Sequence, residues 1–144
     1  GGYCSLEYGR PVRDFELAFE ARTRGTRPDG SGFSSVRFRR PDGQTSDLGG
    51  LELSPYPATL FRIEGGSKLV NLARVPSADR PPPADGYYAY KLRVVGKRVT
   101  VWLNGAQVSD GEYPDLPAGD RLQWTIDPNC TELRVRSVRF TDLS

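Results

Sequence analysis

Hydrophobic and polar residues alternate through much of this chain, and the alternation is clearest between positions 88 and 105. Two alternating runs flank a Gly96-Lys97 turn, and the second run ends in Asn104-Gly105, a dipeptide typical of tight turns. One face of this segment is apolar and carries Tyr88, Tyr90, Leu92, Val94, Val99, Val101 and Leu103. Because successive side chains of a strand point to opposite faces, a period of two predicts a pair of half-buried antiparallel strands.

Shorter alternating runs predict further strands along the chain, at 14–22, 33–39, 48–54, 59–64, 69–75, 122–126 and 132–141. In the last run the phase of the alternation slips between Val135 and Val138, which is typical of a β-bulge. Segments 76–86 and 108–119 are predicted as loops, and the first holds three consecutive prolines, which cannot join a sheet ladder. No run of ten or more residues shows the helical period of 3.6.

These elements predict an all-β fold, a two-sheet antiparallel β-sandwich. The spacing of the runs indicates roughly nine to eleven short strands. Most of the 16 glycines and 12 prolines fall between the alternating runs, where turns are expected. A chain of 144 residues without an internal boundary fits one domain with its own core, so we expect a single domain over 1–144.

The charge balance and hydropathy exclude two classes of partner. The net charge is +2, from 20 basic and 18 acidic residues, without the concentrated basic face that nucleic acid requires. The local excess at Arg37, Arg39 and Arg40 fits a solvated surface. No run approaches the length of about 20 apolar residues that spans a membrane, and no hydrophobic signal segment is present. We therefore expect neither nucleic-acid binding nor membrane insertion of this segment.

The two cysteines stand near opposite ends, at Cys4 and Cys130. With no histidine in the chain, they cannot build a usual structural zinc site. Terminal strands of a sandwich commonly lie side by side, so we predict a Cys4–Cys130 disulfide and hence a secreted or cell-surface location. The alternative is two unrelated buried thiols in a reducing compartment.

The candidate chemistry favours sugar binding over catalysis. Glycoside hydrolysis usually takes two carboxylates across a cleft, and Glu52 is the only acid that the pattern recommends. Without histidine there is no Ser-His-Asp arrangement. Aromatic rings with polar neighbours suit sugar rings. Trp102 lies on the polar side of its strand and is a candidate for such a contact, and the alternative is that a loop covers it. Trp124 lies on the core side of its strand. The candidate ligand-binding set draws on both outer faces, because the sequence does not assign strands to sheets: Arg37, Arg39, Glu52, Tyr87, Lys91, Trp102, Asn104 and Gln123.

The order of motifs resembles a known superfamily. An Asp-Phe-Glu-Leu strand begins at Asp14, a Gly-Leu-Glu-Leu strand begins at Gly50, the 88–105 segment closes on Trp-Leu-Asn-Gly, and a Leu-x-Val-Arg-Ser-Val-Arg-Phe run begins at Leu133. This order resembles the concanavalin A-like lectin/glucanase superfamily and is most similar to the 3-keto-disaccharide hydrolase-like domains. The resemblance implies a jelly roll whose concave face commonly meets carbohydrate, and it does not imply catalysis.

Two departures weigh against an enzyme of this type. Asp85-Gly86-Tyr87-Tyr88 stands where family members usually carry a Gly-Glu-Trp-Asn-like segment, and the glucanase motif Glu-x-Asp-x-x-Glu is absent. We therefore expect a non-catalytic carbohydrate-binding module. The alternatives are a hydrolase of the 3-keto-disaccharide type that uses Glu52, and a structural or protein-interaction sandwich.

Expected partners are carbohydrate or other domains of the parent protein. We expect no cofactor. The resemblance leaves room for one calcium ion at a loop, with oxygen ligands drawn from Asp115, Asp120, Asp127 and Asp142.

Overall fold

The hairpin predicted between positions 88 and 105 forms strands β7 (Tyr88–Val95) and β8 (Arg98–Leu103). They pair antiparallel, with Leu92 opposite Val101. Asn104 and Gly105, which connect β8 to β9, have φ angles of 50° and 85°. This is the pair of left-handed conformations that a type I′ turn needs, and it explains the Asn-Gly dipeptide.

The computed structural model describes residues 4–26, 28, 30, 32–40, 49–54, 59–64, 68–73, 85–114, 116, 119–126 and 129–144. These residues form antiparallel strands and no helix. The other strands are β1 (Cys4–Glu7), β2 (Phe15–Gly25), β3 (Ser34–Arg40), β4 (Gly49–Ser54), β5 (Thr59–Glu64), β6 (Lys68–Ala73), β9 (Ala106–Glu112), β10 (Arg121–Ile126) and β11 (Cys130–Asp142).

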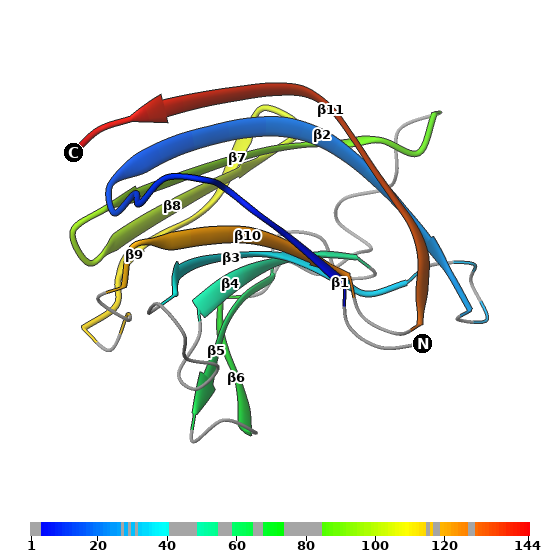
Figure 1. Cartoon of the computed structure of the whole chain (residues 1–144), viewed down its shortest axis with the longest axis horizontal. Coiled ribbons are helices and arrows are strands. Elements are labelled where there is room, and N and C mark those ends of the chain that lie inside the picture. Colours follow the sequence, from blue (N-terminus) through cyan, green and yellow to red (C-terminus); the bar gives the residue numbers. More distant parts are fainter. Residues whose placement is uncertain are drawn as a thin grey trace.

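Two sheets make up the fold, which confirms the predicted β-sandwich. One has six strands in the order β1-β10-β3-β4-β5-β6, and the other has five in the order β11-β2-β7-β8-β9. Both sheets are bowed in the same sense, and β5 and β6 turn away from the five-stranded sheet (Figure 1). The outer face of the six-stranded sheet is therefore the hollow side of the bow.

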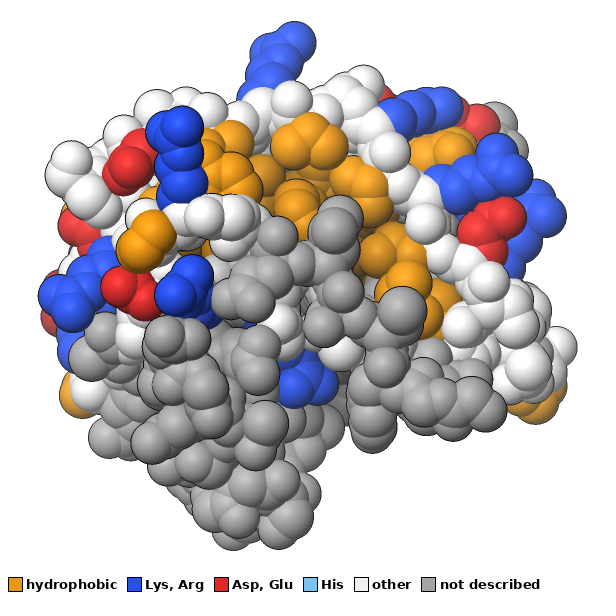
Figure 2. Space-filling model, in the orientation of Figure 1, with side chains coloured by type: hydrophobic (Ala, Val, Ile, Leu, Met, Phe, Trp, Pro, Cys, Tyr) orange, Lys and Arg blue, Asp and Glu red, His pale blue; other side chains and the backbone are white. Residues whose placement is uncertain are grey.

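The core lies between the sheets and is built from the apolar parity of the strands. It includes Phe15, Leu17, Phe19, Val36, Phe38, Leu51, Tyr90, Leu92, Val94, Val99, Val101, Leu103 and Leu122. Trp124 packs against this core, and its ring meets Phe19 edge-on at 5.7 Å between centroids. In the space-filling view the described apolar side chains gather in the middle of the visible surface, and the charged side chains lie mainly toward its left and right ends (Figure 2).

The structure corrects one predicted loop. Residues 106–112 form the edge strand β9, which pairs with β8, although 108–119 was predicted as a loop. An edge strand has one neighbour and little buried surface, so the alternation is weak, and Val108 is the only large apolar residue of β9. The bulge predicted in the last strand is confirmed, because the register of β11 shifts between Arg136 and Arg139.

The predicted Cys4–Cys130 disulfide is not found among the described residues. Cys130 is a buried thiol whose sulfur lies 3.3 Å from the carbonyl oxygen of Glu132, and the Cys4 side chain lies outside the described part of the chain. The premise that the terminal strands pair is also wrong. Strand β1 pairs with β10 in one sheet, and β11 pairs with β2 in the other.

Candidate functional site

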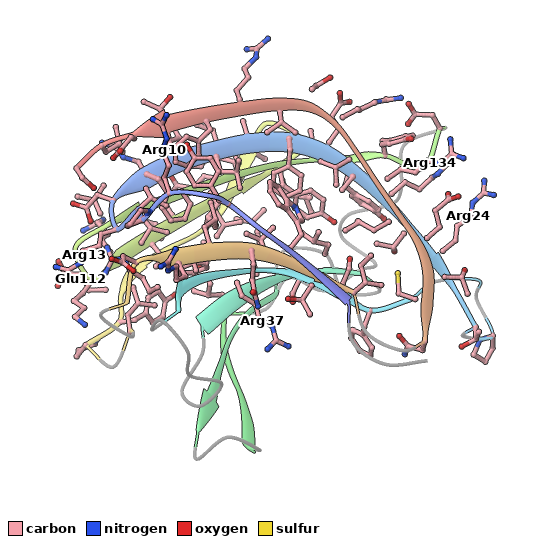
Figure 3. All side chains as sticks on the ribbon, viewed as in Figure 1. Arg10, Arg13, Arg24, Arg37, Glu112 and Arg134 are labelled. Carbon is pink, nitrogen blue, oxygen red and sulfur yellow. The ribbon has the colours of Figure 1, made fainter. Side chains whose placement is uncertain are left out.

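Polar residues of adjacent strands lie side by side on the outer face of the six-stranded sheet. Gln123 lies opposite Arg37, Thr125 lies opposite Ser35, and Glu52 is in register with Ser35. Directly opposed residues share a face, so Ser35, Arg37, Gln123 and Thr125 form one surface, here called the polar face. Arg37 extends from β3 away from the five-stranded sheet (Figure 3). Arg37 and Gln123, both predicted as site residues, are thus brought together.

Hydrogen bonds within the polar face fix its side chains. Gln123 Nε2 donates to Thr125 Oγ1 at 3.3 Å, and Arg37 Nε donates to Ser35 Oγ at 3.4 Å. Ser35, Gln123 and Thr125 are each only 5 % exposed, although they lie on an outer face. Buried polar groups that satisfy one another hold defined positions, so these three side chains form a fixed support for the partly exposed Arg37.

The register extends this surface across the sheet. Gly50 lies opposite Arg37, Phe61 lies opposite Gly50, and Glu7 lies opposite Gln123. Sequence reasoning missed Phe61 and Glu7. Alternation shows which residues of one strand share a face, but it does not tell which sheet the strand joins or which strand is its neighbour.

Glu7 and Glu52 are not register partners in the six-stranded sheet. Strands β1 and β4, which carry Glu7 and Glu52, are separated by β10 and β3. Three spacings of about 4.8 Å put the two backbones about 14 Å apart. In the described register no Asp or Glu is a direct neighbour of Glu52.

Trp102 and Lys91 lie together on the opposite surface, the outer face of the five-stranded sheet. They are register partners, and the Lys91 Nζ stands 4.7 Å from the centroid of the Trp102 ring. The same ammonium forms an ion pair of 2.9 Å with Glu16 on β2. Hence the predicted candidates divide between two surfaces that the core separates.

Tyr87, just before β7, has two guanidinium groups near its ring. Arg136 lies 3.7 Å and Arg22 lies 5.0 Å from its ring centroid. Arg136 also pairs with Asp85 at 2.7 Å and with Glu20 at 3.4 Å. The hydrogen bond from Arg136 lowers the pKa of the Asp85 carboxyl below its usual value. These cations already contact the ring that was predicted to stack on sugar.

Asn104 acts in a turn. Its side-chain oxygen accepts a hydrogen bond of 2.9 Å from the backbone N–H of Ala89, and its backbone N–H donates to the Ala89 carbonyl at 2.7 Å. These bonds tie the β8–β9 turn to β7.

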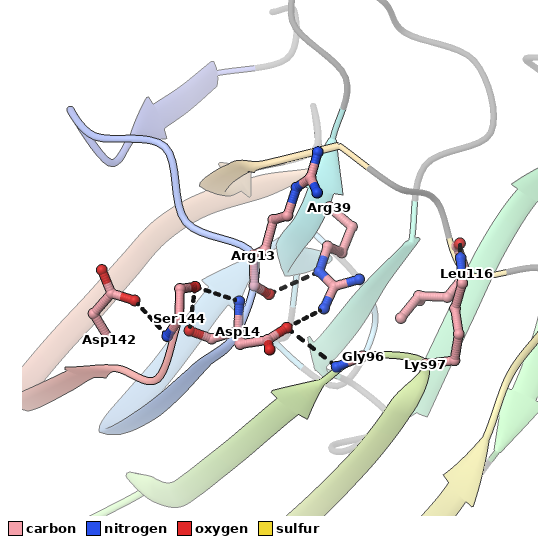
Figure 4. A network of polar contacts seen from close by, with 8 residues as sticks. All are labelled: Arg13, Asp14, Arg39, Gly96, Lys97, Leu116, Asp142 and Ser144. Atoms are coloured by element: carbon pink, nitrogen blue, oxygen red, sulfur yellow. Dashed lines mark hydrogen bonds and ion pairs between the residues drawn. The ribbon is translucent and has the colours of Figure 1, made fainter.

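Arg39 does not lie on the polar face, although it shares parity with Arg37. The β3–β10 register shifts here, and Arg39 has a φ of 56°, so its side chain turns into the end of the sandwich. It is 4 % exposed, pairs with Asp14 at 2.8 Å and donates to the Arg13 carbonyl at 2.7 Å (Figure 4). Burial lowers the pKa of the Arg39 guanidinium, and Asp14 opposes that shift. Arg39 is therefore a structural link between the sheets.

The calcium ligands considered from sequence are not gathered in the described residues. Asp115 and Asp127 lie outside them, Asp120 lies 3.9 Å from Arg121, and Asp142 accepts a hydrogen bond from the Ser144 N–H. No group of three His, Cys, Asp or Glu side chains suited to a metal occurs in the described part of the chain. Nor do those residues form a helix that is long and apolar enough to cross a bilayer.

Solved structures share this fold at low sequence identity. The carbohydrate binding module CBM66 from Bacillus subtilis matches with a TM-score of 0.72 and 14 % identity, over 98 % of this chain and 83 % of the module. The exoplasmic/lumenal domain of VIP36, bound to Ca²⁺ and Man3GlcNAc, matches at 0.68 and 14 %, over 99 % and 75 %. Sheep galectin-11 matches at 0.58 and 12 %, over 98 % of both chains.

The sequence comparison is more specific. No curated protein matches the chain significantly. The model of the 3-keto-alpha-glucoside-1,2-lyase-like domain matches residues 1–137, nearly the whole length. Together with the shared β-sandwich, this confirms the resemblance seen in the sequence. The chain belongs to the family of 3-keto-alpha-glucoside-1,2-lyase-like domains.

Proposed function

We propose that this domain binds a glycan on the polar face without catalysing its breakdown. The observation that carries the proposal is the register pairing of Arg37 with Gln123 on the hollow side of the six-stranded sheet, where each is hydrogen-bonded to a residue of its own strand. The fold supports it, because the similar structures include a carbohydrate binding module and a mannose-containing complex.

The chemistry of this surface suits neutral sugar rings. The Arg37 side chain is partly exposed, and its planar guanidinium carries several N–H donors that match sugar hydroxyls, while the buried Gln123 and Thr125 support the surface around it. In the backbone register Gly50 lies opposite Arg37, and position 61 on β5 lies opposite Gly50. The internal hydrogen bonds reduce the ordering cost on binding.

We expect Arg37→Ala to weaken glycan binding while the domain stays folded. Loss of a charge-assisted hydrogen bond reduces affinity about tenfold or more. A glycan array identifies a ligand for the wild-type domain, and calorimetric titration then compares the variants. Arg93→Ala removes an exposed arginine from the opposite face and serves as the control. Equal losses in the two variants, or none in Arg37→Ala, would contradict the assignment.

The family description favours a second candidate, a lyase or hydrolase acting on a 3-keto sugar with Glu52 as its acid. Glycoside hydrolysis usually takes two carboxylates, and in the described register no second acid lies opposite Glu52, which argues against this candidate. We expect incubation with disaccharides, including 3-keto forms, to give turnover no faster than buffer. Turnover that is lost in Glu52→Gln but retained in Glu7→Gln would favour the enzyme instead.

The location outside the cytoplasm stays a prediction, because its premise was the disulfide. A structural or protein-interaction role is the third candidate. It would be favoured if no glycan on the array bound the domain in a way that depends on Arg37.

A further inference from the structure

A hollow of about 390 Å³ lies on the outer face of the five-stranded sheet, on the other side of the core from the polar face. Its volume falls in the range of about 300–1,000 Å³ that small-molecule sites occupy. The lining includes small, aromatic and cationic residues: Ala18, Ala89, Lys91, Trp102, Gly105 and Arg139.

The strand register explains why the surface is hollowed here. Arg139 on β11 lies opposite Ala18 on β2, Ala18 lies opposite Lys91, and Lys91 lies opposite Trp102. Opposed residues share a face, so one alanine stands between two long cationic side chains. Ala89 lies on the neighbouring strand two positions before Lys91, and it also lines the hollow. The result is a small apolar floor with a cation on each side and an indole along one wall.

The two cations differ in how far they are neutralised. Lys91 is paired with Glu16 at 2.9 Å, and it also lies over the Trp102 ring. Glu20, the acid that lines the hollow, is paired with Arg136 at 3.4 Å. The exposed Arg139 side chain forms no ion pair or hydrogen bond within the described structure. The hollow therefore has an excess positive charge at Arg139.

We propose that this hollow is a second binding site and that it takes an acidic sugar, a hexuronate. A uronate ring has an apolar C–H face, which suits the Trp102 wall and the alanine floor. Its carboxylate suits the Arg139 guanidinium, which can donate two parallel hydrogen bonds, with Lys91 adding charge from the other side. A neutral sugar would leave Arg139 without an anionic partner. The site is independent of the polar face, and it can fail while glycan binding at Arg37 holds.

The test compares trigalacturonate with its fully methyl-esterified form, which has the same rings without the charge. Binding is followed by NMR through the indole N–H signals of Trp102 and Trp124, assigned with a Trp102→Phe variant. We expect trigalacturonate to shift the Trp102 signal and leave the Trp124 signal in place. Binding should weaken as salt is raised, and the methyl ester should bind at least tenfold more weakly.

Three variants distinguish binding in this hollow from binding elsewhere on the domain. Arg139→Gln should weaken trigalacturonate binding about tenfold. Arg134→Gln makes the same change of charge on the same strand, outside the hollow, and should have little effect. Arg37→Ala should not alter it. The proposal is overturned if the acid and the ester bind equally, if the Arg139 and Arg134 variants lose binding equally, or if binding depends on Arg37. It is also overturned if citrate, an anion without a sugar ring, shifts the Trp102 signal equally.

Discussion

Replacing Asp14 with alanine is expected to lower the free energy of unfolding by about 3 kcal/mol, because it leaves the buried Arg39 guanidinium without its carboxylate partner. Arg39 is 4 % exposed, and its Nη2 lies 2.8 Å from Asp14 Oδ1. The same oxygen accepts a hydrogen bond of 3.1 Å from the Gly96 N–H, so one carboxylate joins β3, the start of β2 and the β7–β8 turn (Figure 4). Urea denaturation monitored by circular dichroism measures the loss.

Asp110→Ala is the matched control for this prediction. Asp110 forms an ion pair of similar length with Arg98, 2.7 Å, and the two carboxylates are similarly exposed, at 28 % for Asp110 and 31 % for Asp14. The arginines differ, because the Arg98 side chain is 55 % exposed and the Arg39 side chain only 5 %. Exposed pairs add little to stability, so this variant should unfold close to the wild-type midpoint. If Asp110→Ala is destabilised as much as Asp14→Ala, the buried link at Arg39 is not the reason for the loss.

Gly32→Ala is expected to destabilise the domain by about 2 kcal/mol or more through overpacking. A Cβ at position 32 would stand 2.5 Å from Cys130 Cα and 2.8 Å from Cys130 Cβ. These atoms belong to the start of β11 and cannot move aside as a flexible side chain can. For a domain of this size the melting temperature should fall by roughly 6 °C.

Gly9→Ala gives the comparison for this prediction, because a Cβ there meets nothing within 4 Å. Differential scanning calorimetry on the two variants should show a large fall for Gly32→Ala and little change for Gly9→Ala. A melting temperature for Gly32→Ala within one degree of wild type would mean that the close approach of Gly32 and Cys130 is wrong.

The alternation of apolar and polar residues predicted most strands and their inner faces, because burying one face of a strand requires an apolar residue at every second position. Leu92, Val101 and Phe19 lie in the core as their parity requires. It failed where a bulge reverses the parity, as at Arg39, and at β9, where exposure removes the apolar signal. The division of the candidates between two faces could not be predicted, because strand order depends on long-range pairing rather than on the residues of one strand.

The two surfaces also differ in what sequence could reveal. Arg37 and Gln123 were recognised as polar-parity residues, but only the register shows that they are partners. The hollow beside Trp102 arises from an alanine between two cations on three separate strands. No local motif encodes such an arrangement.

Glycan binding on the outer face of the six-stranded sheet can be mapped residue by residue. The best neutral ligand from the array is titrated into ¹⁵N-labelled domain, and the amide shifts are followed by NMR. We expect the shifts to concentrate on β3, β4 and β10 around Arg37 and Gln123, and to be lost in Arg37→Ala. Shifts concentrated on β2, β7 and β8, or a map that Arg37→Ala leaves unchanged, would contradict binding at the polar face.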